Sequence, residues 1–172
     1  MKRQFLKLAL VVSAVAVLTA CGGDDDTPAA PAPTKNVVQL AQATPSLSIL
    51  VEAVIAADLA TTLSGAGPFT VFAPTDAAFA ALLTELKTTK EALLADKPLL
   101  TKVLTYHVVS DKVLKANIPF GKPIKSLQGQ EFTIDTSAVI TDASTRKSQI
   151  TATDILATNG VVHLIDKVIL PK

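Results

Sequence analysis

The sequence has no tryptophan, a single tyrosine and a single cysteine among its 172 residues. With one cysteine the chain cannot form an internal disulfide, so its fold has to be stabilised by other means. The remaining aromatic residues are six phenylalanines, which indicates a core built mainly from aliphatic side chains. Histidine is also scarce, and only two are present, His107 and His163.

Several signatures of catalysis and of cofactor binding are missing as well. The chain has no G-x-S-x-G nucleophile elbow, and its GAGPF stretch at 65–69 lacks the G-K-S/T that completes a phosphate-binding loop. The two histidines are far apart and have no cysteine pair near them, so they do not form a zinc motif. We therefore expect no cofactor, no metal and no enzymatic activity.

Charge excludes a further class of partner. The 16 basic and 15 acidic residues give a net charge of +1, and removal of residues 1–20 would leave 13 basic and 15 acidic residues. Neither form has the excess of positive charge that binding to nucleic-acid phosphates requires. We expect no nucleic-acid partner.

The first 21 residues have the order of a bacterial export signal. Lys2, Arg3 and Lys7 precede an apolar run at 8–17 that is shorter than the roughly 20 residues a membrane-spanning helix needs. The ending LTAC at 18–21 resembles the lipobox of bacterial lipoproteins, which implies a signal peptide at 1–20 and lipidation of Cys21. The alternative is an ordinary secreted protein with an unpaired cysteine.

Residues 21–35 are expected to form a flexible tether between the lipid and a domain. They contain three aspartates at 24–26 and three prolines at 28, 31 and 33, a composition that favours extended chain reaching roughly 40 Å. The residue after the cysteine is Gly22. In bacterial lipoproteins, an aspartate at this position would favour retention in the inner membrane. The pattern thus predicts a lipid anchor in the bacterial cell envelope, with a weak preference for the outer membrane.

Residues 36–172 are long enough for one domain with its own core. The first half has apolar residues at helical spacing near 47–55, 79–86 and 99–104. Between the first two stripes, Phe69 to Ala73 is predicted to be a strand that Pro74 ends. Thr75 or Asp76 would then cap the next helix through a side-chain oxygen.

The second half alternates polar and apolar residues at 131–136 and 148–157, which is typical of strands. Asn159-Gly160 is the pair best suited to a type I′ hairpin turn, and the return strand would place His163 among branched apolar neighbours. Helices followed by strands indicate an α+β fold.

The segment VLTYHVVSD at 103–111 contains the adjacent pair Tyr106 and His107. If the segment is extended, the two rings point to opposite faces, with one in the core and the other near a groove or the surface. Catalysis by His107, or by a site assembled from His107, His163 and Asp166, is one hypothesis. The hypothesis we prefer is structural, because a buried histidine is tolerated when its ring nitrogens have hydrogen-bond partners.

Three segments together resemble the fasciclin domain family: GPFTVFAPTDAAF at 67–79, TYHVV at 105–109 and ATNGVVHLIDKVILP at 157–171. The resemblance implies an N-terminal helical layer packed on a β-wedge of two sheets. It also implies non-catalytic adhesion or ligand binding outside the cytoplasm. In animal relatives the segment matching Tyr106-His107, and an Asp-Ile pair matching Asp154-Ile155, are linked to receptor binding.

The leading functional hypothesis is a membrane-anchored, extracytoplasmic adhesion module that attaches to a cell-surface or matrix component. A second hypothesis is a carrier of small apolar ligands, with a groove between helices and sheet. The third is the histidine-dependent enzyme described above. For Asp154, a hydrogen-bonding role near the hairpin competes with the recognition role that the resemblance implies.

Overall fold

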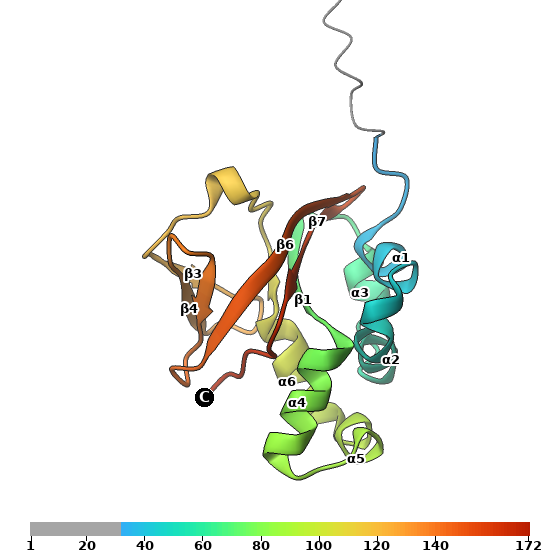
Figure 1. Cartoon of the computed structure of the whole chain (residues 1–172). Helices are drawn as coiled ribbons and strands as arrows, with labels where there is room; N and C mark the ends of the chain where they lie inside the picture. The colour runs from blue at the N-terminus through green and yellow to red at the C-terminus, as the bar shows by residue number, and fades with distance from the viewer. Residues whose placement is uncertain (1–31) are drawn as a thin grey trace, which may run out of the picture. The chain divides into compact units, whose positions relative to one another are not determined.

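The computed structural model describes residues 32–172, and Figure 1 shows the arrangement of their helices and strands. Residues 33–172 form one compact unit. The predicted signal peptide and Cys21 lie outside the described residues, so those predictions stay predictions. Among the helices of residues 32–172, none combines the length and the hydrophobicity needed to cross a bilayer.

Helices dominate the first half of the unit, as the apolar spacing predicts. They are α1 (Val37–Gln42), α2 (Ser48–Ala56), α3 (Ala60–Ser64), α4 (Asp76–Leu86), α5 (Lys90–Ala95) and α6 (Lys97–Tyr106). Two short 3₁₀ turns, η1 (Pro45–Leu47) and η2 (Lys115–Asn117), lie in the connections. Strand β1 (Phe69–Pro74) is inserted between α3 and α4.

The remaining strands follow α6 along the chain. They are β2 (Val108–Val109), β3 (Pro123–Lys125), β4 (Glu131–Ile134), β5 (Val139–Thr141), β6 (Lys147–Ala157) and β7 (Gly160–Ile165). The strand order within residues 32–172 is β2-β1-β7-β6-β5-β4-β3, and among these strands only β1 and β7 pair in parallel.

Strand β6 joins two sheets into a wedge. Its first residues pair with β5, and the stretch from Ile150 onward pairs with β7. The pairing with β7 shifts register twice, between Ile150 and Ala152 and between Ala152 and Ile155. Such bulges bend a strand and increase its twist. One long strand therefore serves both sheets, and the predicted helical layer on a β-wedge is confirmed.

Two apolar cores lie on opposite faces of β1 and β7. Val71 and Val162 belong to the core shared with the helices, whereas Phe72 and Ile165 belong to the core inside the wedge. This division follows the two-residue period of a strand. Figure 1 shows α1, α2 and α3 beside β1 and β7, and β3 and β4 on the other side.

The connection from β1 to α4 is close to the prediction. Thr75 is the N-cap of α4, and its hydroxyl accepts a hydrogen bond from the Ala78 amide at 3.4 Å. The strand runs through Pro74 and does not end before it. Asp76 has another role, since its carboxylate accepts from the Ser48 hydroxyl at 2.6 Å and from the Ile49 amide at 2.8 Å.

The predicted type I′ turn at Asn159-Gly160 is wrong. Ala157 pairs with Gly160, so Thr158 and Asn159 form the turn, and neither Asn159 nor Gly160 has a positive φ. The glycine is needed for a different reason: a Cβ on Gly160 would lie 2.1 Å from the Phe69 carbonyl oxygen. Close approach of β1 to the hairpin, rather than the turn conformation, requires glycine here.

The segment with Tyr106 and His107 is not extended, and the expectation that one of the two rings lies near a groove or the surface is wrong. Helix α6 continues to Tyr106, and His107 is its C-cap with φ −80° and ψ −4°. Their relative exposures are 0% and 2%, so neither ring reaches a surface. The helix continues because Leu100, Val103 and Leu104 keep its apolar face in the core up to the last turn.

Candidate functional site

Tyr106 links the end of α6 to strand β4 and to the loop after β5. Its hydroxyl donates to the Glu131 carbonyl at 3.0 Å and accepts from the Ala143 amide at 2.9 Å. Its ring stands edge-to-face against Phe132, with centroids 5.9 Å apart. Burial raises the pKa of the Tyr106 hydroxyl, so the group stays protonated and keeps donating to Glu131.

His107 uses both ring nitrogens on the backbone. The Ile169 amide donates to Nε2 at 3.1 Å, and Nδ1 lies 2.8 Å from the Val103 carbonyl oxygen. Because an amide can only donate, Nε2 accepts, and the proton is assigned to Nδ1, which donates to Val103. Desolvation lowers the pKa of His107 to about 4. The ring is therefore a neutral, fixed connector between α6 and the segment after β7.

His163 has the same kind of environment on the other side of the sheet. The Asp154 amide donates to Nδ1 at 3.3 Å, so the proton lies on Nε2, which donates to the Val113 carbonyl at 2.8 Å. The ring is fully buried and stacks on Phe72 with centroids 5.4 Å apart. His163 thus joins β7 to β6 and to the loop before η2.

Asp154 and Ile155 lie in the bulged part of β6. Asp154 has φ 58° and is exposed, and its carboxylate accepts from the Lys115 amide at 2.8 Å. Ile155 is half-buried and pairs with Val162. The Asp154 side chain thus holds the start of η2 and stays exposed, and its role in recognition stays a prediction. No hydrogen bond within residues 32–172 connects this pair to Tyr106 or His107.

Asn159 secures the hairpin to the helical layer. Its side-chain amide donates to the carbonyls of Leu63 and Gly65 at 2.8 and 2.9 Å, and its oxygen accepts from the Val37 amide at 3.0 Å. The Asn159 carbonyl also accepts from the Phe69 amide. These contacts connect α1, α3 and β1 to a single turn.

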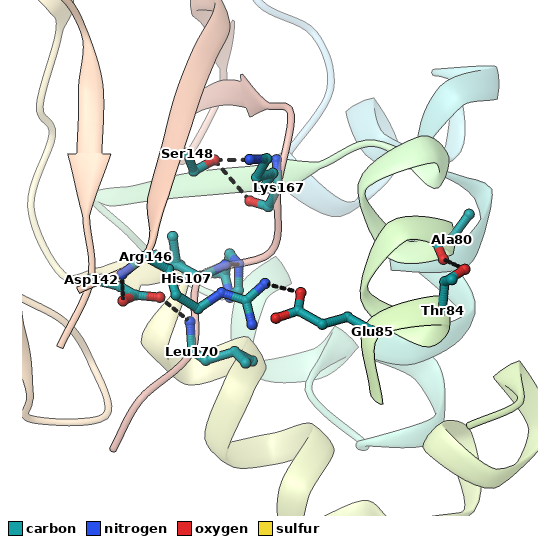
Figure 2. A network of polar contacts seen from close by, with 10 residues as sticks. Ala80, Thr84, Glu85, His107, Asp142, Arg146, Ser148, Lys167 and Leu170 are labelled. Atoms are coloured by element: carbon teal, nitrogen blue, oxygen red, sulfur yellow. Dashed lines mark hydrogen bonds and ion pairs between the residues drawn. The ribbon is translucent and has the colours of Figure 1, made fainter. Parts of the chain in front are cut away.

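Asp142 is a further key residue, which the sequence reasoning missed. Its Oδ1 accepts from the amides of Ser144 and Arg146 at 2.9 and 2.8 Å, and its Oδ2 accepts from the Leu170 amide at 2.8 Å. Figure 2 shows Asp142 between Arg146 and Leu170, with Arg146 reaching Glu85 at 2.6 Å. Aspartate before Ala-Ser-Thr indicates a turn, but nothing local points to Leu170.

These contacts define what we call the Tyr-His clamp: Tyr106, His107 and Asp142 with their backbone partners. The clamp holds Ile169 and Leu170 against α6 and the wedge. Asp166, the third member of the hypothetical catalytic site, instead accepts from Ser148 and Gln149. The described residues contain no His/Cys/Asp/Glu cluster that could hold a metal.

The cavity next to His107 is too small for a substrate. It lies between α1, α2, α3 and the strands β1 and β7, and its volume is about 30 Å³. That is room for about one water molecule. With both ring nitrogens already bonded to the backbone, His107 has no free position from which to move a proton.

Comparison with known proteins places this geometry in a family. The fasciclin domain model matches residues 45–171. Protein sll1483 of Synechocystis sp. is 43% identical over 139 residues, which cover 79% of this chain and 73% of that protein. Transforming growth factor-beta-induced protein ig-h3 of Sus scrofa is 35% identical over 140 residues, which cover 81% of this chain and 20% of that protein.

A solved structure shows the same fold. The FAS1 domain pair from the insect cell adhesion molecule Fasciclin I matches with a TM-score of 0.69 at 16% identity, covering 80% of this chain and 51% of that chain. The match of the family model over most of the chain agrees with the helical layer, the β-wedge and the three segments that resemble the family. The chain belongs to the fasciclin domain family.

Proposed function

We propose that the chain is a non-catalytic adhesion module that attaches its bearer to a cell-surface or matrix component. The observation that carries this proposal is the saturation of both histidines by backbone partners in the interior. The residues best suited to chemistry thereby stabilise the fold. The function is then carried by side chains exposed on the surface of the domain. The solved relative is a cell adhesion molecule by name, which supports the same conclusion.

The proposal includes a lipid anchor on Cys21 and a position outside the cytoplasm, at the bacterial cell envelope. Its support is the order of a basic segment, an apolar run, LTAC and a Pro-rich stretch in the sequence. A single acyl chain gives marginal membrane binding, whereas two or more chains anchor a protein stably. The tether would let the domain reach past the lipid headgroups.

Two experiments test the two parts separately. Truncation after Lys35 keeps the anchor and removes the domain, and we expect it to reduce attachment to surfaces and cell aggregation. Unchanged attachment on several surfaces would contradict the adhesion role. For the anchor, Cys21→Ala should abolish incorporation of labelled palmitate, and the Cys21→Ala chain serves as the unanchored control in the attachment assay.

The alternative of a ligand carrier with a groove between helices and sheet has weak support in the structure. The cavity at that position is about 30 Å³, far below the roughly 300 Å³ at which drug-sized pockets begin. A larger apolar groove of about 170 Å³ lies elsewhere in the helical layer, between α4, α5, α6 and residues 170–171 beside Lys102.

A further inference from the structure

The turn between β6 and β7 places Asn159 directly before Gly160, and the fold requires each of these residues for a separate reason. The Asn159 side chain makes hydrogen bonds of 2.8, 2.9 and 3.0 Å to the backbone of α1 and of the end of α3. Gly160 leaves no room for a side chain, because a Cβ there would meet the Phe69 carbonyl oxygen. Two independent contacts therefore impose an Asn-Gly pair on this turn.

An Asn-Gly pair is chemically reactive when its backbone is free to move. The Gly160 backbone nitrogen attacks Cγ of Asn159, its proton leaves with the side-chain nitrogen as ammonia, and a succinimide ring forms. Water then opens the ring at either carbonyl carbon, which gives aspartate or isoaspartate at position 159. Glycine favours ring closure because it has no Cβ and because its backbone reaches many conformations. Asparagine is accordingly one of the thermolabile residues.

The folded structure opposes this reaction. Ring closure makes Cγ of Asn159 tetrahedral and expels the nitrogen that donates to the carbonyls of Leu63 and Gly65. The backbone is fixed as well, since the Asn159 carbonyl accepts from the Phe69 amide at 3.0 Å and the buried Gly160 is paired across the hairpin. The three side-chain hydrogen bonds therefore have to open before the nitrogen of Gly160 can reach Cγ.

Helix α1 and the residues just before it supply two of the contacts that hold the turn. The Val37 amide donates to the Asn159 side chain, and the Thr158 amide donates to the Lys35 carbonyl at 2.9 Å. The helix has six residues, about half the length at which an isolated helix becomes stable. It begins at a capping box on Asn36. Detachment of α1 would leave the Asn159 side chain held by the end of α3 alone.

We propose that Asn159-Gly160 is a deamidation site that reacts when α1 leaves the turn, and that the reaction makes this release permanent. The product carboxylate has no N–H to donate to the carbonyls of Leu63 and Gly65, and it places a negative charge against their oxygens. Isoaspartate also lengthens the backbone before Gly160, where β1 leaves no room. The proposal is independent of the lipid anchor and of the adhesion role.

The test follows deamidation of the full chain at neutral pH by mass spectrometry of the tryptic peptide 148–167. Asn159 is the only asparagine in that peptide, and fragmentation separates its mass change from one at Gln149. We expect the folded chain to deamidate at least about tenfold more slowly than the same chain unfolded in guanidinium chloride, because three hydrogen bonds must open first. Equal rates in the two states would overturn the proposal.

Removal of a helix cap tests the role of α1. Asn36→Ala deletes the N-cap of α1, and we expect about fivefold faster deamidation of the folded chain, which is the usual effect of a lost cap. Thr89→Ala is the matched control, because Thr89 caps α5, which makes none of the hydrogen bonds of the Asn159 side chain. It should keep the wild-type rate. Equal acceleration by both variants, or none by Asn36→Ala, would contradict release through α1.

The second part of the proposal is tested with the aspartate product. In Asn159→Asp we expect amide hydrogen exchange in α1 to become at least about tenfold faster, because two hydrogen bonds to the end of α3 are lost. Asn117→Asp makes the same change of charge at an exposed position of η2 and should leave this exchange unchanged. Wild-type exchange in α1 of the Asn159→Asp chain would refute the claim that deamidation releases the helix.

Discussion

Substitutions at His107 are expected to separate its two hydrogen bonds. In His107→Ala, the Ile169 amide loses its acceptor, which costs about 1–3 kcal/mol for a buried donor, and the vacated ring leaves a cavity. Truncating large buried side chains to alanine costs about 2–5 kcal/mol in other proteins. We expect a combined destabilisation of at least about 3 kcal/mol for His107→Ala, the sum of the two lower bounds.

His107→Gln and His107→Asn are the matched pair. Glutamine can place an acceptor near the position of Nε2 for the Ile169 amide, whereas asparagine can place a donor near Nδ1 for the Val103 carbonyl. We expect the free energy of unfolding to fall least in the glutamine variant and most in alanine. Urea unfolding followed by circular dichroism measures this, and greater stability of asparagine than glutamine would refute the greater weight given to the bond from the Ile169 amide.

The same residue predicts a pH dependence. The folded-state pKa of His107 is lowered to about 4 from 6.5, so below pH 6.5 the unfolded chain binds a proton that the folded chain excludes. The stabilisation from neutral His107 is complete above pH 6.5 and is lost as the pH falls towards 4. Between pH 7 and 5 the wild-type chain should lose about 2 kcal/mol more than His107→Gln. Equal losses in both proteins would contradict the burial of the ring.

Three further substitutions test other contacts by thermal and urea unfolding. Gly160→Ala should destabilise by about 3 kcal/mol, the upper end of the usual cost of overpacking, because its Cβ would meet the Phe69 carbonyl at 2.1 Å; a wild-type melting temperature would argue against that approach of β1. Tyr106→Phe should cost about 1–3 kcal/mol, since the Ala143 amide loses its acceptor, and a neutral effect would indicate another acceptor. Asp142→Ala removes the acceptor of three backbone amides and should cost more than Tyr106→Phe; the reverse order would refute its role.

Local signals in the sequence predicted much of the fold. The passage from strand β1 through the Thr75 cap to α4 depends on residues within about ten positions of one another, and the structure agrees with it apart from the end of the strand. The two faces of β7 follow from the two-residue period alone. The helical layer and the wedge agree with the resemblance of three segments to one family.

The features that the sequence did not predict depend on distant contacts. The apolar run after Leu104 is compatible with strand or helix, and the burial of both rings depends on Ile169 and Glu131, which lie far along the chain. The turn at Thr158-Asn159 is shaped by α1 and α3 through the Asn159 side chain and by β1 through the Asn159 carbonyl. Asp142 and the groove beside Lys102 likewise combine segments that only the folded chain brings together.

The central claim is that the Tyr-His clamp supports the fold of an adhesion module and takes no part in contact or chemistry. The most direct test is to measure surface attachment by cells that bear the His107→Gln chain. The measurement compares surface attachment by cells bearing wild-type and His107→Gln protein, at a temperature and pH where both are folded and equally abundant. We predict that cells bearing the His107→Gln chain attach to the same extent as cells bearing the wild-type chain. Loss of attachment by a folded, equally abundant His107→Gln chain would make the ring a functional group and contradict the account.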